Sequence, residues 1–319
     1  MNLDFKIILP ILIAFAISVI LSPVIIPFLK KLKCGQFVRD DGPESHLKKS
    51  GTPTMGGLII LLAITVTTLF YIKDYPDVLP VLFVTLGFGL IGFLDDYIKI
   101  IMQHSMGLRA WQKMLLQIIV TGVFAYYIEK YTDINNELII PFIGKTVHME
   151  PWLYVVLLFI IVLGTVNGAN LTDGLDGLAS SVTMLIAAFF TVVAIGLGSG
   201  ISPITCATMG SLLGFLVYNV HPAKIFMGDT GSLALGGFVA ATAYMLQMPL
   251  FIIIVAFIYF IEVLSVIIQV TSFKLTGKRV FKMAPLHHHF EESGWEEPKI
   301  VSMFAIVTAV CCIIGLLAI

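Results

Sequence analysis

Residues 78–96 read VLPVLFVTLGFGLIGFLDD, an uncharged apolar run that ends in two neighbouring carboxylates, Asp95 and Asp96. An α-helix needs about 20 predominantly apolar residues to cross the hydrocarbon core of a bilayer, so this run predicts a membrane-spanning helix. An ionised carboxylate at membrane depth is costly unless it lines a polar cavity or meets a partner, and it therefore indicates function. The stretch predicts a membrane fold with a polar site at the end of one helix.

The composition of the whole chain is typical of a polytopic membrane protein. Of its 319 residues, 58% are hydrophobic and 12% are charged, whereas about 25% of a soluble domain is charged. The formal net charge of −1 gives no general attraction to polyanions, so we expect no nucleic-acid partner. No separate soluble domain is evident, and residues 1–319 are expected to form one integral membrane domain.

Apolar runs of the same kind recur along the chain and predict an all-α fold of about ten transmembrane helices. They lie near residues 7–29, 54–72, 78–94, 114–129, 152–170, 178–197, 203–219, 231–247, 249–271 and 300–318. Two long uncharged stretches must be divided to reach ten, one at residues 196–203 and the other at residues 247–249. Within the ninth span, Glu262 either faces the bundle or marks a break in the helix. Alternating apolar residues within 130–150 favour a small hairpin.

The distribution of Lys and Arg predicts the orientation of these spans. Most of the 19 basic residues fall in the loops after odd-numbered spans, and the other side holds only Lys6, Lys73, Lys130 and Lys145. Cytoplasmic loops carry the excess of positive charge, which places the odd-numbered loops in the cytoplasm and both termini outside. We therefore expect a multi-pass protein of the cytoplasmic membrane.

Each of the five cytoplasmic loops holds a polar or glycine-rich motif, and the outer loops hold none comparable. The motifs read GTPTMGG at residues 51–57, LDDYIK at 94–99, NLTDGLDG at 170–177, NVHPAKIFMGDTG at 219–231 and PLHHHF at 285–290. Apolar runs and basic residues alone define this topology, so the position of all five motifs on one side supports it independently. We expect an active site on the cytoplasmic face.

The carboxylates of these motifs favour a site for a divalent cation and phosphates. Asp95 and Lys99 share a helix face at i,i+4 spacing, and Asp173 and Asp176 lie beside glycines that let backbone N–H groups approach a ligand. Each motif alone also fits an ordinary structure: a solvated helix end, a polar turn or, for Asp229, a helix N-cap. Together on one face they suit magnesium-assisted phosphoryl chemistry better than proton-coupled transport, whose carboxylates lie nearer the bilayer midplane.

The triple histidine and one aromatic residue each allow two interpretations. His287, His288 and His289 are adjacent, so a helix cannot turn all three toward one metal, and a zinc site is not expected. Histidine can donate to phosphate oxygens or relay protons near neutral pH, or the run can be a solvated basic loop. Phe226 can pack in a core or stack on a base, and the sequence alone favours the core.

At these motifs the chain closely resembles the phospho-N-acetylmuramoyl-pentapeptide transferases of bacterial peptidoglycan synthesis, a family of the polyprenyl-phosphate N-acetylhexosamine-1-phosphate transferase superfamily. The resemblance covers essentially the whole chain, with all five motifs in order. Residues 94–97 and 170–177 are shared across the superfamily, whereas 51–57 and 285–290 single out the muramoyl-pentapeptide enzymes. The resemblance implies an enzyme of the bacterial cytoplasmic membrane that moves phospho-MurNAc-pentapeptide from UDP-MurNAc-pentapeptide to undecaprenyl phosphate, giving lipid I and UMP.

The resemblance also implies a Mg²⁺ cofactor, a homodimer and roles for individual residues. It makes Asp229 the first metal ligand with Asp95 close to it, while Asp96 deprotonates or orients the lipid phosphate. The residues implied around the nucleotide are Asn170, Asp173, Asp176, Asn219 and Phe226, the last stacking on uracil. Those implied to hold phosphates or complete the polar site are Lys49, Thr54, Lys99 and Lys113, with His287, His288 and His289 on the pyrophosphate or sugar side.

Two mechanisms and two rival functions stay open. Either the lipid phosphate attacks the β-phosphate directly, with Asp96 as base, or an aspartate first forms a phospho-enzyme. Direct attack is favoured because a phosphate oxyanion is already a competent nucleophile. The nearest rival function is transfer of GlcNAc-1-phosphate to the same lipid. A proton-coupled transporter is the rival from another class, and it predicts uptake without UMP release.

Overall fold

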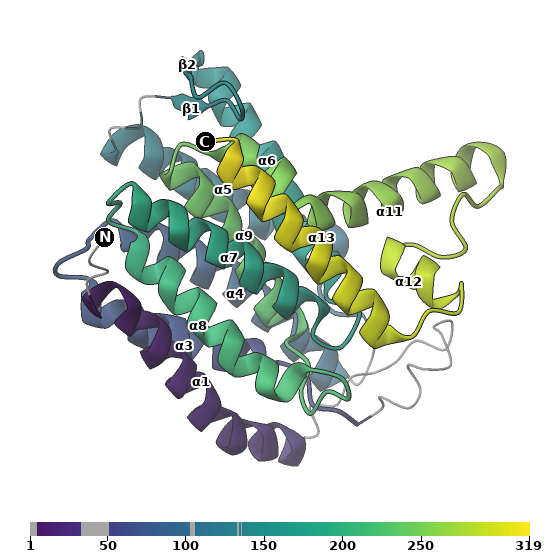
Figure 1. Ribbon diagram of the computed structural model, residues 1–319. Coiled ribbons are helices and arrows are strands. Elements are labelled where there is room, and N and C mark those ends of the chain that lie inside the picture. The colour runs from purple at the N-terminus through teal and green to yellow at the C-terminus, as the bar shows by residue number, and fades with distance from the viewer. Residues whose placement is uncertain (1–4, 33–50, 103–105, 133, 135) are drawn as a thin grey trace.

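The computed structural model describes residues 5–32, 51–102, 106–132, 134 and 136–319, and most of them are helical (Figure 1). The long helices of these residues are α1 (Phe5–Lys31), α3 (Gly57–Tyr71), α4 (Val78–Met102), α5 (Ala110–Tyr131), α6 (Pro151–Thr172), α7 (Leu178–Gly196), α8 (Ser202–Asn219), α9 (Gly228–Met245), α11 (Phe257–Thr276) and α13 (Glu297–Leu317). The short elements are β1 (Glu137–Ile139), β2 (Thr146–His148), the 3-10 turn η1 (Pro249–Phe251), α10 (Ile252–Val255) and α12 (Leu286–Glu291). The prediction of a mainly helical fold with membrane-spanning helices is confirmed.

Six helices of the described residues are long and apolar enough to cross a membrane, namely α1, α4, α6, α7, α11 and α13. Each of the ten expected ranges overlaps a long helix. However, α3 has only 15 residues, and α5, α8 and α9 carry more polar and small side chains. Length and composition therefore establish six candidate spans and leave the count of ten open.

The structure confirms two local predictions, the division of the apolar stretch near residues 196–203 and the small hairpin within 130–150. The stretch around residues 196–203 is divided, since α7 ends at Gly196 and α8 begins at Ser202. The hairpin also exists, because β1 pairs with β2 in antiparallel register with Leu138 opposite Val147.

The ninth expected range is broken, but at Ala256 rather than at Glu262. Ala256 has φ −105° and ψ 33°, outside the helical range, and separates α10 from α11. No Gly or Pro stands nearby in 250–260, so tertiary packing rather than residue propensity makes the break. Glu262 lies within continuous helix and is fully buried, so it faces protein. Beyond the break, α11 runs away from the bundle and α12 lies beside it (Figure 1).

Helix α9 forms the centre of the bundle, with its residues from Thr230 to Tyr244 buried. Glycines let its neighbours approach closely, as small residues do between membrane helices. A Cβ on Gly92 of α4 would lie 2.0 Å from the carbonyl oxygen of Asp229, and a Cβ on Gly236 would lie 2.5 Å from Cα of Val166 in α6. The beginning of α9 is therefore held against the last turns of α4.

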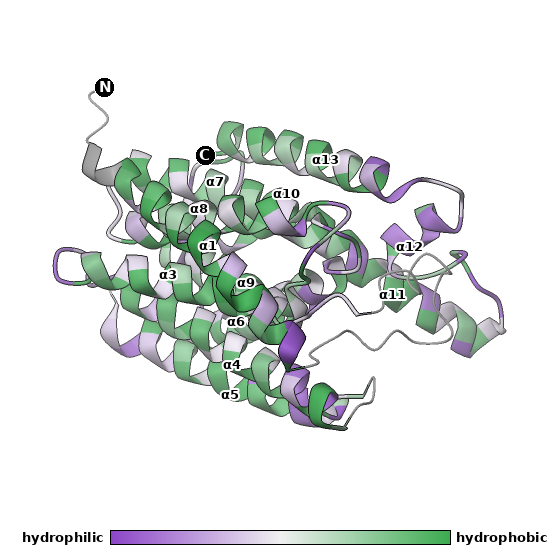
Figure 2. Cartoon of the chain, turned by 90° about the horizontal axis from the view of Figure 1, so that it is seen from below, coloured by the Kyte–Doolittle hydropathy of each residue, from purple (hydrophilic) through white to green (hydrophobic). Residues whose placement is uncertain are grey.

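The outer surface of the bundle is apolar. Large side chains such as Ile20, Phe70 and Val192 are more than half exposed, as lipid contact permits. Figure 2 shows hydrophobic residues along the helices and hydrophilic residues gathered in the loops at their ends. Polar chemistry is therefore concentrated at helix ends, in agreement with the motif positions.

Candidate active site

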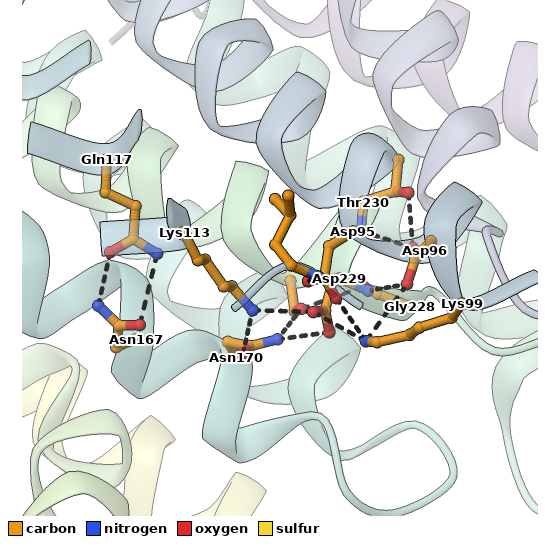
Figure 3. A network of polar contacts seen from close by, with 12 residues as sticks. Asp95, Asp96, Lys99, Lys113, Gln117, Asn167, Asn170, Gly228, Asp229 and Thr230 are labelled. Carbon is orange, nitrogen blue, oxygen red and sulfur yellow. Dashed lines mark hydrogen bonds and ion pairs between the residues drawn. The ribbon is translucent and has the colours of Figure 1, made fainter. Parts of the chain in front are cut away.

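Of the five aspartates in the loop motifs, three lie close together at the junction of α4 and α9. Asp95 and Asp96 come from α4 and Asp229 from the first turn of α9, and one oxygen of each lies within 4.8 Å of the other two. Asp95 and Asp96 are buried, whereas Asp229 is half-buried. The expected convergence of these carboxylates is thus found in the structure (Figure 3).

Two lysines neutralise much of this cluster. Lys99 Nζ lies 2.6 Å from Asp95 Oδ2, 3.1 Å from Asp229 Oδ2 and 3.9 Å from Asp96 Oδ1. Lys113 Nζ, from α5, lies 2.8 Å from the same oxygen of Asp229. Asp229 therefore stands between two ammonium groups (Figure 3). With three carboxylates and two ammonium groups, the cluster keeps one formal negative charge.

Asn170 joins the end of α6 to the cluster. Its Nδ2 donates to Asp229 Oδ1 and to Ser232 Oγ, each at 2.9 Å, and its Oδ1 accepts from Lys113 Nζ at 3.2 Å. One turn further along α5 and one turn back along α6, the amides of Gln117 and Asn167 pair, with Asn167 Nδ2 donating to Gln117 Oε1 at 2.9 Å. Sequence reasoning missed this pair, although its spacing from Lys113 and Asn170 repeats one helical turn.

Asp96 has a structural partner that the sequence did not indicate. Its oxygens accept hydrogen bonds from the backbone N–H of Asp229 at 3.2 Å and of Thr230 at 2.9 Å, and from the Thr230 hydroxyl at 2.7 Å. Met227, the residue at the N-cap of α9, makes no side-chain cap bond. Asp96 therefore caps α9 from a neighbouring helix, and the N-cap interpretation of Asp229 is wrong.

Gly107 and Leu108, which lie just before α5, cover Asp95. The backbone N–H of Leu108 donates to Asp95 Oδ1 at 2.8 Å, and a Cβ on Gly107 would lie 2.6 Å from that oxygen. A backbone donor carries no side-chain identity, so no sequence pattern could have indicated this contact.

The first polar motif is tied to the fourth by backbone hydrogen bonds. The Gly56 N–H donates to the Phe226 carbonyl and the Gly57 N–H to the Met227 carbonyl, each at 2.8 Å, and the Phe226 N–H donates to the Pro53 carbonyl at 2.9 Å. Thr54 is thereby held near the cluster, since a Cβ on Gly228 would touch both Thr54 Oγ1 at 2.8 Å and Asp96 Oδ2 at 2.6 Å. Gly228 has φ +70°, which suits glycine. Phe226 is half-buried, and Lys49 lies outside the described residues.

Asp176 and Asn219 form hydrogen bonds with other residues of the protein. Asp176 Oδ2 lies 3.2 Å from His221 Nδ1 and accepts from the Ala223 N–H at 3.0 Å, while its own N–H donates to Glu297 Oε1 at 2.5 Å. Glu297 Oε2 lies 3.3 Å from His221 Nδ1. These contacts hold the third loop, the fourth loop and the start of α13 together, and Glu297 was missed by sequence reasoning.

Asn219 ties the fourth loop to itself and to α7. Its Nδ2 donates to the Ile225 carbonyl at 2.9 Å, and its Oδ1 accepts from Ser180 Oγ at 2.7 Å. The buried side chain therefore shapes the segment that leads to Phe226. Within the described part of the chain, Asn219 makes no hydrogen bond to the acidic cluster.

Asp173 caps the C-terminal end of α6 and is half-buried. Burial, followed by the negative charges of Asp229, Asp96 and Asp176, raises the pKa of its carboxyl well above the ordinary value. A carboxyl in this field is held more readily in its neutral form. Asp173 therefore borders the cluster electrostatically without a hydrogen bond to it.

The three histidines turn to three different partners. His287 is buried, with Nδ1 3.2 Å from Glu262 Oε2. His288 Nδ1 lies 2.6 Å from Glu291 Oε2, and His289 Nδ1 accepts from the Lys282 N–H at 3.1 Å. The two metal-compatible groups found among the described residues contain none of the three.

The bundle of apolar helices and its enclosed ionic cluster define a polytopic membrane protein with a polar site at the helix ends. Comparison with known proteins narrows this class. The family model described as glycosyl transferase family 4 matches residues 78–247, and phospho-N-acetylmuramoyl-pentapeptide-transferase signature 1 matches residues 49–61.

Relatives that carry the name phospho-N-acetylmuramoyl-pentapeptide-transferase match over nearly their full length. One from Clostridium botulinum is 54% identical over 96% of this chain and 94% of its own. One from Clostridium kluyveri is 50% identical over 98% and 99%, and one from Acetivibrio thermocellus is 51% identical over 100% and 98%. The chain belongs to the phospho-N-acetylmuramoyl-pentapeptide-transferase family, which confirms the resemblance read from the loop motifs.

Proposed function

We propose that this protein transfers phospho-MurNAc-pentapeptide from UDP-MurNAc-pentapeptide to undecaprenyl phosphate, releasing UMP and forming lipid I. The observation that carries the proposal is the junction of α4, α5 and α9, where Asp95, Asp96 and Asp229 meet Lys99 and Lys113. Attack of one phosphate on another requires fixed charges that offset the developing negative charge. Family membership supplies the identity of the two substrates.

The donor set at this junction fits a magnesium ion. Mg²⁺ prefers carboxylate oxygens and keeps positions open for substrate phosphates. Asp229 and Asp95 would hold it, since each offers an oxygen that already binds the Lys99 ammonium group. When bound, the metal would polarise the phosphoryl oxygens and neutralise part of their charge.

The residues of the chain supply the remaining parts of the reaction. An oxygen of the lipid phosphate forms the new bond to the β-phosphorus, and the bond from that phosphorus to the α-phosphate oxygen breaks, so that UMP leaves with the α-phosphate. Lys99 and Lys113 offset the charge of both substrates. Asp96 orients the lipid phosphate or takes its proton, and its three hydrogen bonds to α9 fix the place of that carboxylate. The triple histidine would face the pyrophosphate or sugar, with the rings of His287 and His288 each held by a carboxylate.

The third and fourth loops are assigned to the nucleotide. Asn170 and Asp173 border the acidic cluster, while Asp176 and Asn219 brace the loops that carry Phe226. Phe226 would stack on uracil, and Thr54, held by the paired first loop, would meet phosphate. Lys49 would also bind phosphate.

The proposed setting is the cytoplasmic membrane, with ten spans, both termini outside, the site facing the cytoplasm, and a homodimer. Its support is that each expected range overlaps a long helix and that the loops with the polar motifs also hold most of the basic residues. The polyprenyl chain can then stay in lipid while its phosphate reaches the ends of α4 and α9.

Release of UMP by the purified protein tests the proposal. The assay contains undecaprenyl phosphate with UDP-MurNAc-pentapeptide or UDP-GlcNAc, with and without magnesium. We expect magnesium-dependent UMP release with the muramoyl donor only, and its loss in Asp229→Asn. Release with UDP-GlcNAc alone would indicate the sister enzyme, and substrate uptake without UMP release would indicate a transporter.

A further inference from the structure

Glu262 is a fully buried carboxylate in α11, a candidate membrane span. Its oxygens accept hydrogen bonds from the Leu286 N–H at 2.9 Å and the His287 N–H at 3.2 Å, and one of them lies 3.2 Å from His287 Nδ1. No Lys or Arg of the described residues pairs with it. A carboxylate in such a place is stable only while these donors stay with it, so α11 and the start of α12 are joined through Glu262.

His287 forms a hydrogen bond through only one of its ring nitrogens within the described part of the chain. Nδ1 faces Glu262, whereas Nε2 is buried and has no hydrogen-bond partner among the described residues. The unpaired nitrogen faces the third loop, because a Cβ built on Gly174 would lie 2.1 Å from it. Gly174 follows Asp173 directly. A buried polar atom without a partner is unusual in a folded protein and indicates a ligand or a mechanistic use.

The other two histidines of the motif do not share this arrangement. His288 pairs with Glu291, and His289 accepts from the backbone of Lys282. Only His287 is at once buried, held by a carboxylate and turned toward the third loop. The motif therefore contains one histidine with a fixed inward orientation and two that bind their own segment.

We propose that Glu262 is a positioning residue: it binds the Nδ1–H of His287 and thereby dedicates Nε2 to the nucleotide diphosphate held beside the third loop. A carboxylate on one ring nitrogen fixes both the tautomer and the ring orientation, so the other nitrogen is the one that acts. Both protonation states of the ring keep a proton on Nδ1, so the orientation holds in each. The inference rests on the proposed transferase function.

A double-mutant cycle between Glu262 and His287 tests this assignment with the UMP-release assay. We expect Glu262→Gln to lower kcat about 10–100-fold, as loss of a partner that orients a working imidazole does, with donor KM changed less than threefold. In a His287→Asn background the same substitution should change kcat less than about twofold, since residues that act through one another are not additive. Additive losses, or full activity of Glu262→Gln, would overturn the proposal.

Two further measurements separate positioning from general support of the fold. Glu292→Gln changes an exposed carboxylate at the end of α12 and should leave kcat within about threefold; a loss equal to that of Glu262→Gln would contradict a special role for the Glu262–His287 pair. Nuclear magnetic resonance of histidine-labelled protein should show an Nδ1–H tautomer, assigned to His287 by its loss in His287→Asn, that disappears in Glu262→Gln, and its persistence would count against the proposal. Absence of UMP release by the wild-type protein would instead reject the proposed function.

Discussion

Asp96 of α4 and Thr230 of α9 are joined by two hydrogen bonds to one carboxylate oxygen, from the Thr230 backbone N–H at 2.9 Å and from its hydroxyl at 2.7 Å. Both side chains are buried. The neighbouring Asp229, the proposed metal ligand, donates its own N–H to the same carboxylate. The capping of α9 by Asp96 thus sets the relative position of the two carboxylates that the proposed reaction needs.

Replacing the hydroxyl tests this capping. Thr230→Val keeps the shape of the side chain but removes one hydrogen bond to a carboxylate, which should lower the free energy of unfolding by about 1.5–3 kcal/mol. We expect a lower unfolding midpoint in detergent and a higher magnesium requirement. Thr242→Val on the same helix is the matched control, because the Thr242 hydroxyl is buried and has no hydrogen-bond partner among the described residues. Equal destabilisation of both variants would contradict a capping role.

The position of Asp229 between two ammonium groups predicts opposite effects on metal and substrate. Lys113→Gln leaves the cluster with one more formal negative charge, so a divalent cation should bind more tightly and the anionic donor more weakly. We expect the half-saturating magnesium concentration to fall and donor KM to rise, each by roughly tenfold, or about 1.4 kcal/mol. Lys130→Gln, at the far end of α5, should change neither. A parallel rise in both constants would rule out this charge argument.

The sequence predicts those parts of the site that depend on the type of side chain at each position. The apolar runs located the long helices, and Asp95, Asp96, Lys99 and Asp229 meet as their motifs predicted. These features follow from local periodicity and from the cost of charge in lipid. Both signals are visible in a single sequence.

The contacts that were missed depend on backbone groups or on tertiary packing. Every residue except proline has a backbone N–H, so the sequence does not show that the one of Leu108 binds Asp95. The helix break at Ala256 could not be predicted either, because no Gly or Pro lies next to it. Glu297, which reaches across to Asp176, stands among other charged residues at the start of α13 and looks like an ordinary surface acid. Such pairings arise only when distant loops are brought together.

Asp173 predicts a pH-dependent difference in stability. Its pKa is raised in the folded protein, chiefly by burial, so ionisation opposes folding. The penalty is absent below the unfolded value, about 3.9, and grows as pH rises toward the folded pKa. In metal-free protein, Asp173→Asn should therefore raise the unfolding midpoint more at pH 8 than at pH 5. A difference between variant and wild type that does not change with pH would reject the raised pKa.

The contact of Gly174 with His287 predicts that even one methyl group is harmful there. A Cβ on Gly174 would lie 2.1 Å from His287 Nε2, so Gly174→Ala must displace a buried ring, at a cost of about 1–3 kcal/mol. UMP release should fall together with the unfolding midpoint. Gly164→Ala in α6, where nothing lies within 4 Å, should be neutral or stabilise the helix by up to about 1 kcal/mol. Tolerance of Gly174→Ala would show that the ring is free to move.

Glu297 is expected to support donor binding rather than chemistry. It accepts from the Asp176 N–H and lies near His221, and so it holds the third and fourth loops together at the start of α13. Glu297→Gln weakens both contacts while the acidic cluster stays intact, so donor KM should rise by roughly tenfold, about 1.4 kcal/mol, with kcat nearly unchanged. Glu296→Gln is the matched control, because the preceding Glu296 is exposed and makes no capping bond. Steady-state kinetics with the UDP-linked donor separates the two constants. A fall in kcat at constant KM would place Glu297 in the reaction itself, because a brace of the nucleotide loops acts on ground-state and transition-state binding alike.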